Sequence, residues 1–238
     1  MRCRYCGSEN NYKNGVVRNK QRYKCKDCGK NFLETDGRIK PENDGKKALA
    51  VMLYTFSKAS YTFLAKKIFK CSPTTIMNWV KKASAEAKMP EITEEIKEIE
   101  FDEMWHFIGA KKKRKWIFKA VDRQTRKTIA WVTGDRNVKT FRKLYNKIKQ
   151  LKNCKFYTDR WKGFFKVLPK DRHIASKKHT FSIEQNNSNT RHYLARMVRK
   201  SKVVSKSEDM LNASLKLLFS LSFDDSVLLD RISKLCYI

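Results

Sequence analysis

Two closely spaced cysteine pairs constrain the N-terminal part of this chain more than any other feature. Cys3 and Cys6 form one Cys-x2-Cys pair, Cys25 and Cys28 form the other, and 18 residues separate the two pairs. Two such turns facing each other supply the four thiolates that a closed structural zinc site prefers. A segment this small cannot fold by core burial alone, so we predict a zinc ribbon over residues 1–37 that depends on Zn2+. A redox pair and chance spacing are the alternatives.

The whole chain is strongly basic. Its 238 residues include 54 Lys and Arg against 24 Asp and Glu, which gives a formal net charge of +30 and an isoelectric point of about 10.0. Because 41% of the residues are hydrophobic, this charge lies on a folded body. Such a body attracts polyanions, so double-stranded DNA is the first partner that we expect. A generally lysine-rich proteome is the alternative explanation.

The hydropathy of the sequence argues against a membrane protein. The longest apolar run covers residues 48–56 and has nine residues, whereas a spanning helix needs roughly 18. Arginine and cysteine occupy the N-terminal positions that a secretory signal would fill with apolar residues. We therefore expect a cytoplasmic protein with no membrane partner.

Residues 45–89 have the apolar spacing of three short helices. Ser72 and Pro73 predict the start of the third helix, because serine is a favoured N-cap and proline a favoured first helical residue. The outward side of that helix carries hydroxyl, amide and cationic groups, namely Thr74, Thr75, Asn78, Lys81 and Lys82. These groups suit base edges and phosphates, so we interpret residues 72–82 as the recognition helix of a helix-turn-helix domain. A three-helix packing module without DNA is the alternative.

Beyond residue 96 the pattern changes to strands and helices in alternation. The predicted strands cover 99–108, 115–122, 127–133, 154–158 and 172–176, and the predicted helices cover 137–151, 161–168 and 180–200. The first three strands look like a meander. A cationic turn between the first two strands, comprising Lys111, Lys112, Lys113 and Arg114, is a plausible contact for phosphates.

Three acidic residues fall at informative points of that order. Asp102 lies inside the first strand among apolar neighbours, Asp159 follows the fourth strand, and Glu184 lies one turn into the last long helix. If the first and fourth strands are neighbours and the helix crosses them, the three carboxylates converge and need divalent cations to offset their charge. Each residue also has an ordinary role available. Asp159 could cap a helix, Glu184 could be exposed, and Asp102 could lie on the surface with Glu103 inward.

With these residues in place, the chain resembles transposases of the insertion-sequence-one family over nearly its whole length. The resemblance rests on the cysteine pairs, the helix-turn-helix, the Asp-Glu-Met-Trp sequence at Asp102, the Tyr-Thr-Asp sequence at Asp159, and Ile-Glu-Gln-Asn-Asn around Glu184. Arg191 lies seven residues after Glu184, where the family has a basic residue. The Gln-Asn pair after Glu184 departs from the family's basic or histidine pair.

The resemblance implies a DDE transposase in a prokaryotic cell, associated with the nucleoid. It implies a ribonuclease H-like catalytic domain that uses Mg2+ or Mn2+ at Asp102, Asp159 and Glu184 to cut the ends of an insertion sequence and join them to target DNA. A homodimer or higher oligomer would hold the DNA ends. A zinc-ribbon and helix-turn-helix regulator with an inactive catalytic domain, or a metal-dependent nuclease without strand transfer, are the alternatives.

The expected fold class is therefore multidomain, mixing α+β and α/β parts. A zinc ribbon (1–37) precedes a helix-turn-helix domain (45–89) and a ribonuclease H-like mixed-sheet domain (97–204). A C-terminal helical segment (205–238) contains an amphipathic helix after Ser207 that packs either on the sheet or against a second protomer.

Overall fold

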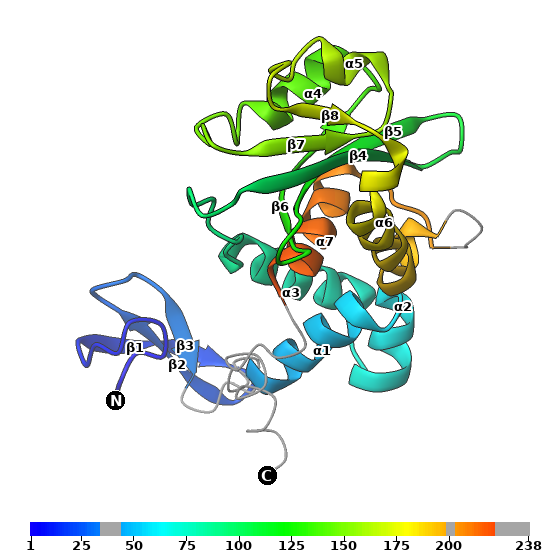
Figure 1. Cartoon of the computed structure of the whole chain (residues 1–238). Coiled ribbons are helices and arrows are strands. Elements are labelled where there is room, and N and C mark those ends of the chain that lie inside the picture. Colours follow the sequence, from blue (N-terminus) through cyan, green and yellow to red (C-terminus); the bar gives the residue numbers. More distant parts are fainter. Residues whose placement is uncertain (34–43, 199–202, 222–238) are drawn as a thin grey trace. The chain divides into compact units, whose positions relative to one another are not determined.

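A computed structural model describes residues 1–33, 44–198 and 203–221 of the chain (Figure 1). It contains two compact units, one comprising residues 1–43 and the other residues 44–238. Outside the described residues lie residues 34–37 of the predicted zinc ribbon, the last two residues of the helix predicted over 180–200, and residues 222–238 of the predicted C-terminal segment.

The first unit is a small antiparallel sheet in the order β1-β2-β3, formed by β1 (Asn11–Val17), β2 (Lys20–Cys25) and β3 (Asn31–Leu33). Among residues 1–33, its buried core contains only Cys3, Cys25 and Phe32, with Tyr23 stacked on Phe32 at 5.8 Å between ring centroids. So few apolar side chains cannot offset the entropy of ordering the chain, as expected for a segment that relies on a metal.

The second unit begins with a group of helices. These are α1 (Asp44–Phe56), a short α2 (Tyr61–Phe63) that continues as the π-helix η1 (Leu64–Phe69), and α3 (Pro73–Glu86). Ser72 caps α3 by accepting a hydrogen bond from the Thr75 amide at 3.1 Å, as its sequence predicts. The buried side chains of this group come from α1, η1 and α3 and include Val51, Leu64, Ile76 and Val80.

A five-stranded mixed sheet forms the body of the second unit. Its strands are β4 (Glu98–Phe107), β5 (Arg114–Asp122), β6 (Thr128–Gly134), β7 (Lys155–Thr158) and β8 (His173–Ala175), in the order β6-β5-β4-β7-β8. The first three pair antiparallel, whereas β7 runs parallel to both β4 and β8. The prediction that the first and fourth strands are neighbours is therefore confirmed.

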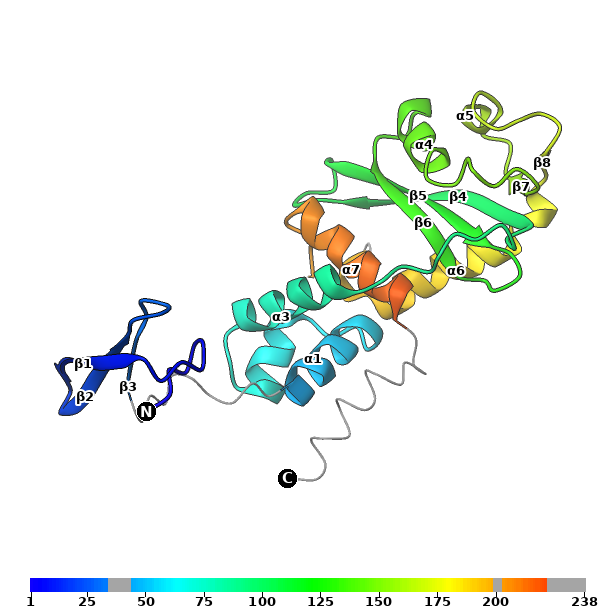
Figure 2. The same ribbon diagram turned by 90° about the vertical axis from the view of Figure 1, so that its left-hand side faces the viewer.

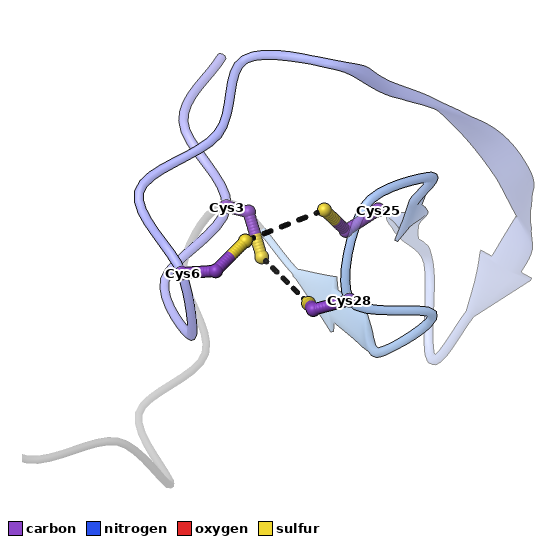
Figure 3. A group of neighbouring side chains, drawn as sticks. All are labelled: Cys3, Cys6, Cys25 and Cys28. Carbon is purple, nitrogen blue, oxygen red and sulfur yellow. Dashed lines mark hydrogen bonds between the residues drawn. The ribbon is translucent and has the colours of Figure 1, made fainter.

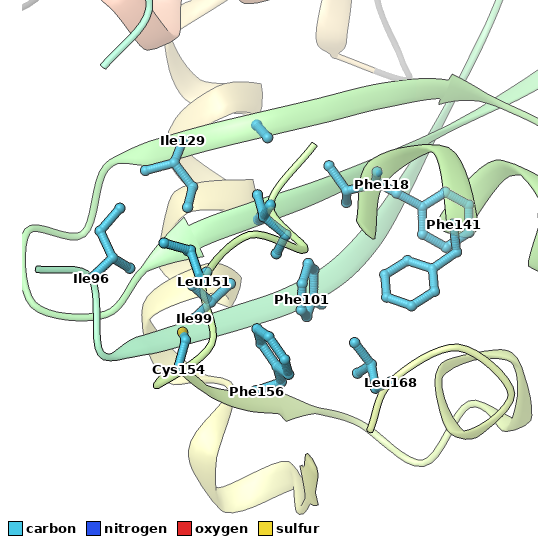
Figure 4. Close-up of a cluster of buried hydrophobic side chains, with 14 of the residues drawn as sticks. Ile96, Ile99, Phe101, Phe118, Ile129, Phe141, Leu151, Cys154, Phe156 and Leu168 are labelled. Carbon is cyan, nitrogen blue, oxygen red and sulfur yellow. The ribbon is translucent and has the colours of Figure 1, made fainter. Parts of the chain in front are cut away.

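Helices cover both faces of this sheet (Figure 2). On one face, α4 (Val138–Tyr145) and α5 (Lys162–Phe165) pack over the largest hydrophobic cluster, which includes Phe101, Phe118 and Phe156 (Figure 4). The other face carries α6 (Phe181–Tyr193) and α7 (Glu208–Ser220). Since side chains alternate along a strand, Phe101 faces the cluster while Glu100 and Asp102 face α6.

Three predicted helices are too long. The helix predicted over 161–168 is limited to α5, after which the Val167 amide bonds to the Phe164 carbonyl three residues earlier in a tighter turn. The helix predicted over 137–151 ends at Tyr145, because the following residues form tighter turns in which the amides of Lys147 and Ile148 bond to carbonyls three residues earlier. The helix predicted over 180–200 ends at Tyr193, where Leu194 becomes extended and a buried 3-10 turn, η3 (Ala195–Met197), follows. In this last case tertiary packing overrides the helical periodicity of the sequence.

Helix α7 contacts two different parts of the second unit. Met210 and Leu217 pack into the hydrophobic cluster of α1, η1 and α3, while Leu211 and Leu215 pack against Met104 and Ile117 of the sheet. Both views show α7 between the sheet and the helical group (Figures 1 and 2). The amphipathic helix predicted after Ser207 therefore packs on the sheet, which is one of the two arrangements that the sequence analysis left open.

The remaining elements are the 3-10 turn η2 (Lys177–His179) before α6 and an isolated bridge between Ile108 and Ser205. Within residues 1–33, 44–198 and 203–221, no helix combines the length and apolar character that crossing a membrane requires.

Candidate functional site

The four N-terminal cysteines converge at one point. The sulfur atoms of Cys3, Cys6, Cys25 and Cys28 all lie within 4.8 Å of one another (Figure 3). The Cys3–Cys28 and Cys6–Cys25 sulfur distances are both 3.6 Å. Tetrahedral zinc with Zn–S bonds of about 2.3 Å separates its sulfurs by about 3.8 Å, so this set of four thiols fits Zn2+.

The two cysteine turns have the same backbone design. The Gly7 amide donates to the Cys3 carbonyl at 2.8 Å, and the Gly29 amide donates to the Cys25 carbonyl at 3.0 Å. Both glycines adopt positive φ, +78° and +69°, a conformation that side chains disfavour. Each turn therefore presents both of its sulfurs toward the other turn. The sequence pattern alone predicted that these four cysteines come together.

Asp102 lies in the middle of β4 and is held from two directions. Its Oδ2 accepts a hydrogen bond from the Asn187 side-chain amide of α6 at 2.7 Å, and its Oδ1 accepts one from the Glu103 amide at 2.8 Å. Burial raises the pKa of the Asp102 carboxyl to about 7, and the charges of Glu103 and Asp159 act in the same direction. A carboxyl in such surroundings favours a cation nearby, because the cation offsets the cost of ionisation.

Asp159 immediately follows β7, whose neighbour is β4. The parallel register pairs Glu98 with Lys155 and Glu100 with Tyr157. Asp159 comes two residues after Tyr157, just as Asp102 comes two residues after Glu100. The Asp159 Oδ1 accepts a hydrogen bond from the Trp161 amide at 2.8 Å, which fixes the turn after the strand. The N-cap residue of α5 is Trp161, which has no side-chain cap bond, so Asp159 does not cap this helix; it does lie close enough to raise the pKa of Asp102.

Glu184 lies in the first turn of α6 and is exposed. Its Oε1 accepts a hydrogen bond from the hydroxyl of Thr180 at 3.2 Å. Glu184 lines the same open pocket as Asp102, a space of about 410 Å³ whose other lining residues are Glu103, Met104, Trp105, Asn187, Ser188 and Arg191. Two of the three predicted acids therefore share a pocket.

The acids are less tightly gathered than the cysteines. Among the described residues, the cysteine group is the one set of three or more Cys, His, Asp and Glu that is arranged to hold an ion. Asp159 is also absent from the residues that line the 410 Å³ pocket. The donor set nevertheless suits a hard cation, since all three side chains offer carboxylate oxygen, the ligand that Mg2+ and Mn2+ prefer.

Three further polar residues organise this site, and the sequence analysis did not identify them. Glu100 is buried, and its carboxylate accepts a hydrogen bond from the Ile183 amide at the start of α6 and pairs with Arg123 at 3.1 Å. Asn187 holds Asp102. Lys119 is fully buried on β5 directly opposite Asp102. The available signal was the even spacing of Glu100 and Asp102 on β4, which puts both on one face.

Lys119 is the most unusual of these residues. Its ammonium donates to Asn186 Oδ1 at 2.5 Å and to the Thr190 hydroxyl at 3.2 Å, so α6 supplies both partners. Burial lowers the pKa of Lys119 to about 7, and the nearby Asp102 opposes that change. Asn186 is one of the residues where the chain departs from the family pattern, and its amide oxygen serves this lysine.

Glu103, on the opposite face of β4 from Asp102, forms an ion pair with Arg136. Arg136 Nε donates to Glu103 Oε1 at 2.7 Å, and its guanidinium lies 4.9 Å from the ring centroid of Trp116 and 5.5 Å from that of Trp161. Glu103, like Glu100, therefore pairs with an arginine of the protein. Asp102 bonds to an amide side chain instead, on the face that α6 covers.

The predicted DNA-contacting residues lie at the surface of the second unit. On α3, Thr74, Asn78, Lys81 and Lys82 are exposed, while Thr75 is half-buried and its hydroxyl bonds to that of Ser72 at 2.9 Å. Lys111, Lys112, Lys113 and Arg114 are exposed at the β4–β5 turn. Arg191 is half-buried on α6, with Nη1 3.9 Å from the Met104 sulfur.

Comparison with known proteins identifies the class of protein that carries these features. Residues 96–219, from just before β4 to the last turn of α7, match the family described as IS1 transposase. The chain belongs to this family of insertion-sequence transposases. The matched region contains the sheet, the three acids and α7 except for its last residue.

Individual relatives give the same result. The chain is 37% identical over 111 residues to "Insertion element IS1 protein InsB" of Shigella flexneri, which is 47% of this chain and 85% of that protein. It is 37% identical over 108 residues to "Insertion element IS1 2 protein InsB" of Escherichia coli K12, which is 45% of this chain and 65% of that protein. The resemblance inferred from the sequence is therefore confirmed, and so is a role in insertion-element DNA recombination.

Proposed function

We propose that this protein binds the terminal inverted repeats of an insertion sequence and catalyses metal-dependent DNA cleavage followed by strand transfer. The observation that carries the proposal is the placement of the acids. Asp102 lies in β4, and Asp159 comes directly after β7, the parallel strand next to it. Glu184 lies on the helix whose Asn187 bonds to Asp102, and it lines the same pocket as Asp102. Membership of the IS1 transposase family supports the same reaction class.

Asp102, Asp159 and Glu184 would hold the catalytic Mg2+ or Mn2+ in this proposal. Bound ions of this kind activate a water or a 3′ hydroxyl and stabilise the leaving oxygen in phosphodiester chemistry. The protein's own contribution is to orient the acids. Asn187 and the Glu103 amide fix Asp102, the Trp161 amide fixes Asp159, and Thr180 fixes Glu184.

The basic groups around this pocket would hold the DNA backbone. Arg191 lines the pocket together with Asp102 and Glu184, so it is placed to bind a phosphate next to the bond that is cut. The exposed cations of the β4–β5 turn, residues 111–114, would contact phosphates farther along the duplex. The exposed groups of α3 would read the terminal repeat.

The domain organisation proposed for this activity has four parts. A zinc ribbon (1–37) and a helix-turn-helix domain (45–89) would bind the element ends, a ribonuclease H-like domain (97–204) would carry the acids, and the segment 205–238 would complete the structure. The mixed five-stranded sheet with helices on both faces supports a ribonuclease H-like domain. We propose that two or more protomers assemble on the paired ends.

Conservative substitution of the acids tests the catalytic assignment. We expect Asp102→Asn, Asp159→Asn and Glu184→Gln to bind a duplex that carries the terminal repeat as the wild type does, but to lose Mg2+-dependent nicking. Glu208→Gln is a matched control, because Glu208 is an acid on the same face of the sheet that pairs with Lys115 at 2.9 Å, away from the pocket residues. Equal nicking by wild type and all three variants would refute the assignment.

The products of the same reaction separate the two rival functions. A transposase joins the freed 3′ end to target DNA, whereas a nuclease leaves cut ends unjoined, so a covalent donor–target product distinguishes them. A regulator without catalysis would bind the repeat and give neither product. Binding itself should weaken steeply as salt increases, because cationic side chains displace counterions from the phosphates.

A further inference from the structure

Helix α6 presents one face to the candidate active site. Glu184, Ser188 and Arg191 all line the pocket that contains Asp102, and their spacing of four and then three residues is that of a single helical face. Phe181 lies three residues before Glu184, which places it on the same face, one turn closer to the start of the helix. Phe181 is not one of the residues that line the pocket, and it shares with them the same face of the helix.

Phe181 is also the most exposed large hydrophobic side chain among the described residues. Its exposed fraction is 67%, although the turn that carries it is firmly anchored. The Ile183 amide bonds to the buried carboxylate of Glu100 at 2.8 Å, and neighbouring Thr180 is buried with its hydroxyl 3.2 Å from Glu184 Oε1. A fixed backbone that holds an aromatic ring in solvent is a preorganised platform, because little entropy is lost when a ligand covers it.

The charge around Phe181 indicates what covers it. Lys177 and Lys178, both exposed in η2, precede it, and Arg191 lies on the other side of the pocket along the same helix face. An exposed ring that follows two exposed lysines in the sequence, on a chain of net charge +30, suits a nucleic acid strand. A protein partner would need roughly 800 Å² of complementary surface on each side, far more than one ring supplies.

We propose that Phe181 stacks on a nucleobase of the DNA strand that is cut at Asp102, Asp159 and Glu184, and so fixes the scissile phosphate in the pocket. This inference rests on the proposed function. Stacking on an aromatic ring accepts any base, so the contact positions the strand without selecting its sequence. The base concerned is unpaired from its partner strand, because only an unstacked base exposes a face to the ring.

The test uses the full-length protein with duplexes that carry 2-aminopurine at single positions on either side of the cut. With wild type we expect a change in 2-aminopurine fluorescence at one position, which Phe181→Ala abolishes and Phe181→Trp retains. We expect Phe181→Ala to slow nicking about 5- to 100-fold, the range that loss of one stacked base produces. Phe165→Ala is the matched control, since Phe165 is 51% exposed but lies on α5 and contacts His173.

The inference would be overturned if Phe181→Ala gave the same 2-aminopurine signal and the same nicking rate as the wild type. Equal losses of nicking rate and signal in Phe181→Ala and Phe165→Ala would overturn it too. A shift of Phe181→Ala to a smaller assembly, with normal fluorescence, would show that the ring binds a second protomer instead. Failure of the proposed function gives a different result, because Asp102→Asn would then nick DNA at the same rate as the wild type. The fluorescence signal does not require catalysis and can be measured in the Asp102→Asn background.

Discussion

The side-chain amide of Asn187 donates to Asp102 Oδ2 at 2.7 Å and thereby joins helix α6 to the central strand β4. Glu184 lies on the same helix, less than one turn before Asn187. One hydrogen bond therefore fixes the direction of the Asp102 carboxylate and the position of the helix that carries the third acid.

Removal of this amide should impair catalysis without weakening DNA binding. In Asn187→Ala the Asp102 carboxylate loses its partner on α6, and we expect about a 10- to 100-fold loss of metal affinity or nicking rate, as is typical when a residue that orients a metal ligand is removed. A titration of nicking against Mg2+ concentration measures the effect. Asn189→Ala, two residues along the same helix and exposed, is the control. Identical Mg2+ curves for wild type and Asn187→Ala would contradict the prediction.

Lys119 gives a prediction about stability. A fully buried ammonium is costly to desolvate, so Lys119→Met, which keeps the apolar stem, should leave the free energy of unfolding unchanged or raise it by about 1–4 kcal/mol. Lys119→Ala should lower it by about 2–5 kcal/mol through the cavity that it leaves. Urea unfolding of the three proteins provides the comparison. A Met variant as unstable as the Ala variant would mean that the bonds to Asn186 and Thr190 outweigh desolvation.

Zinc removal should affect the two units of the structure unequally. The core of residues 1–33 contains only Cys3, Cys25 and Phe32, so chelation should unfold this segment while residues 44–221 keep their fold. Proton–nitrogen NMR spectra before and after treatment with a chelator would show which amide signals collapse. Cys28→Ser should reproduce the change without chelator, and Cys154→Ser, at a buried cysteine of the sheet cluster, should not. Loss of signals throughout the protein would contradict this independence.

His106 makes the stability of the second unit sensitive to acid. It is buried on β4 with its Nε2 3.1 Å from the Ser205 hydroxyl, and burial, together with the charges of Arg196 and Arg191, lowers its pKa to about 4. The unfolded chain binds a proton near pH 6.5, whereas the folded chain does not until about pH 4. The stability that neutral His106 allows is therefore present above pH 6.5 and falls as the pH decreases toward 4.

Thermal unfolding at pH 7.5 and pH 5 measures this effect. We expect the wild type to lose on the order of 1–2 kcal/mol from His106 between these values, and His106→Gln to lose correspondingly less. His192→Gln, at an exposed position of α6, is the control. Equal losses in all three proteins would assign the acid sensitivity to other groups.

Much of the sheet and the cysteine site could be predicted because local patterns determine them. Runs rich in Ile, Val, Phe and Trp, bounded by polar segments, place β4 to β6 within a residue of their bounds, and the Cys-x2-Cys spacing identifies all four sulfurs. The early ends of α4 and α6 could not be read from the sequence, since the residues beyond them keep helical periodicity and only packing of the buried η3 turn stops α6.

The polar residues around Asp102 were missed for a related reason. Glu100 and Lys119 look like surface residues in a chain that is 33% charged, and their burial becomes evident only when α6 covers that face of the sheet. The roles of Asp102, Asp159 and Glu184 remain predictions. Their order on the elements suggested a shared site, and the register of β4 and β7 is the structural fact that supports it.

The position of α7 has a consequence for the spacing on the DNA between the sequence that the protein recognises and the bond that it cuts. This helix packs on both the sheet and the helical group that contains α3. It therefore holds the proposed recognition helix at a set distance from the proposed cutting site within one unit. The number of base pairs between the sequence that is read and the bond that is broken is then set by the protein. An end carrying one inserted base pair would present the wrong phosphate, rotated by about a tenth of a helical turn.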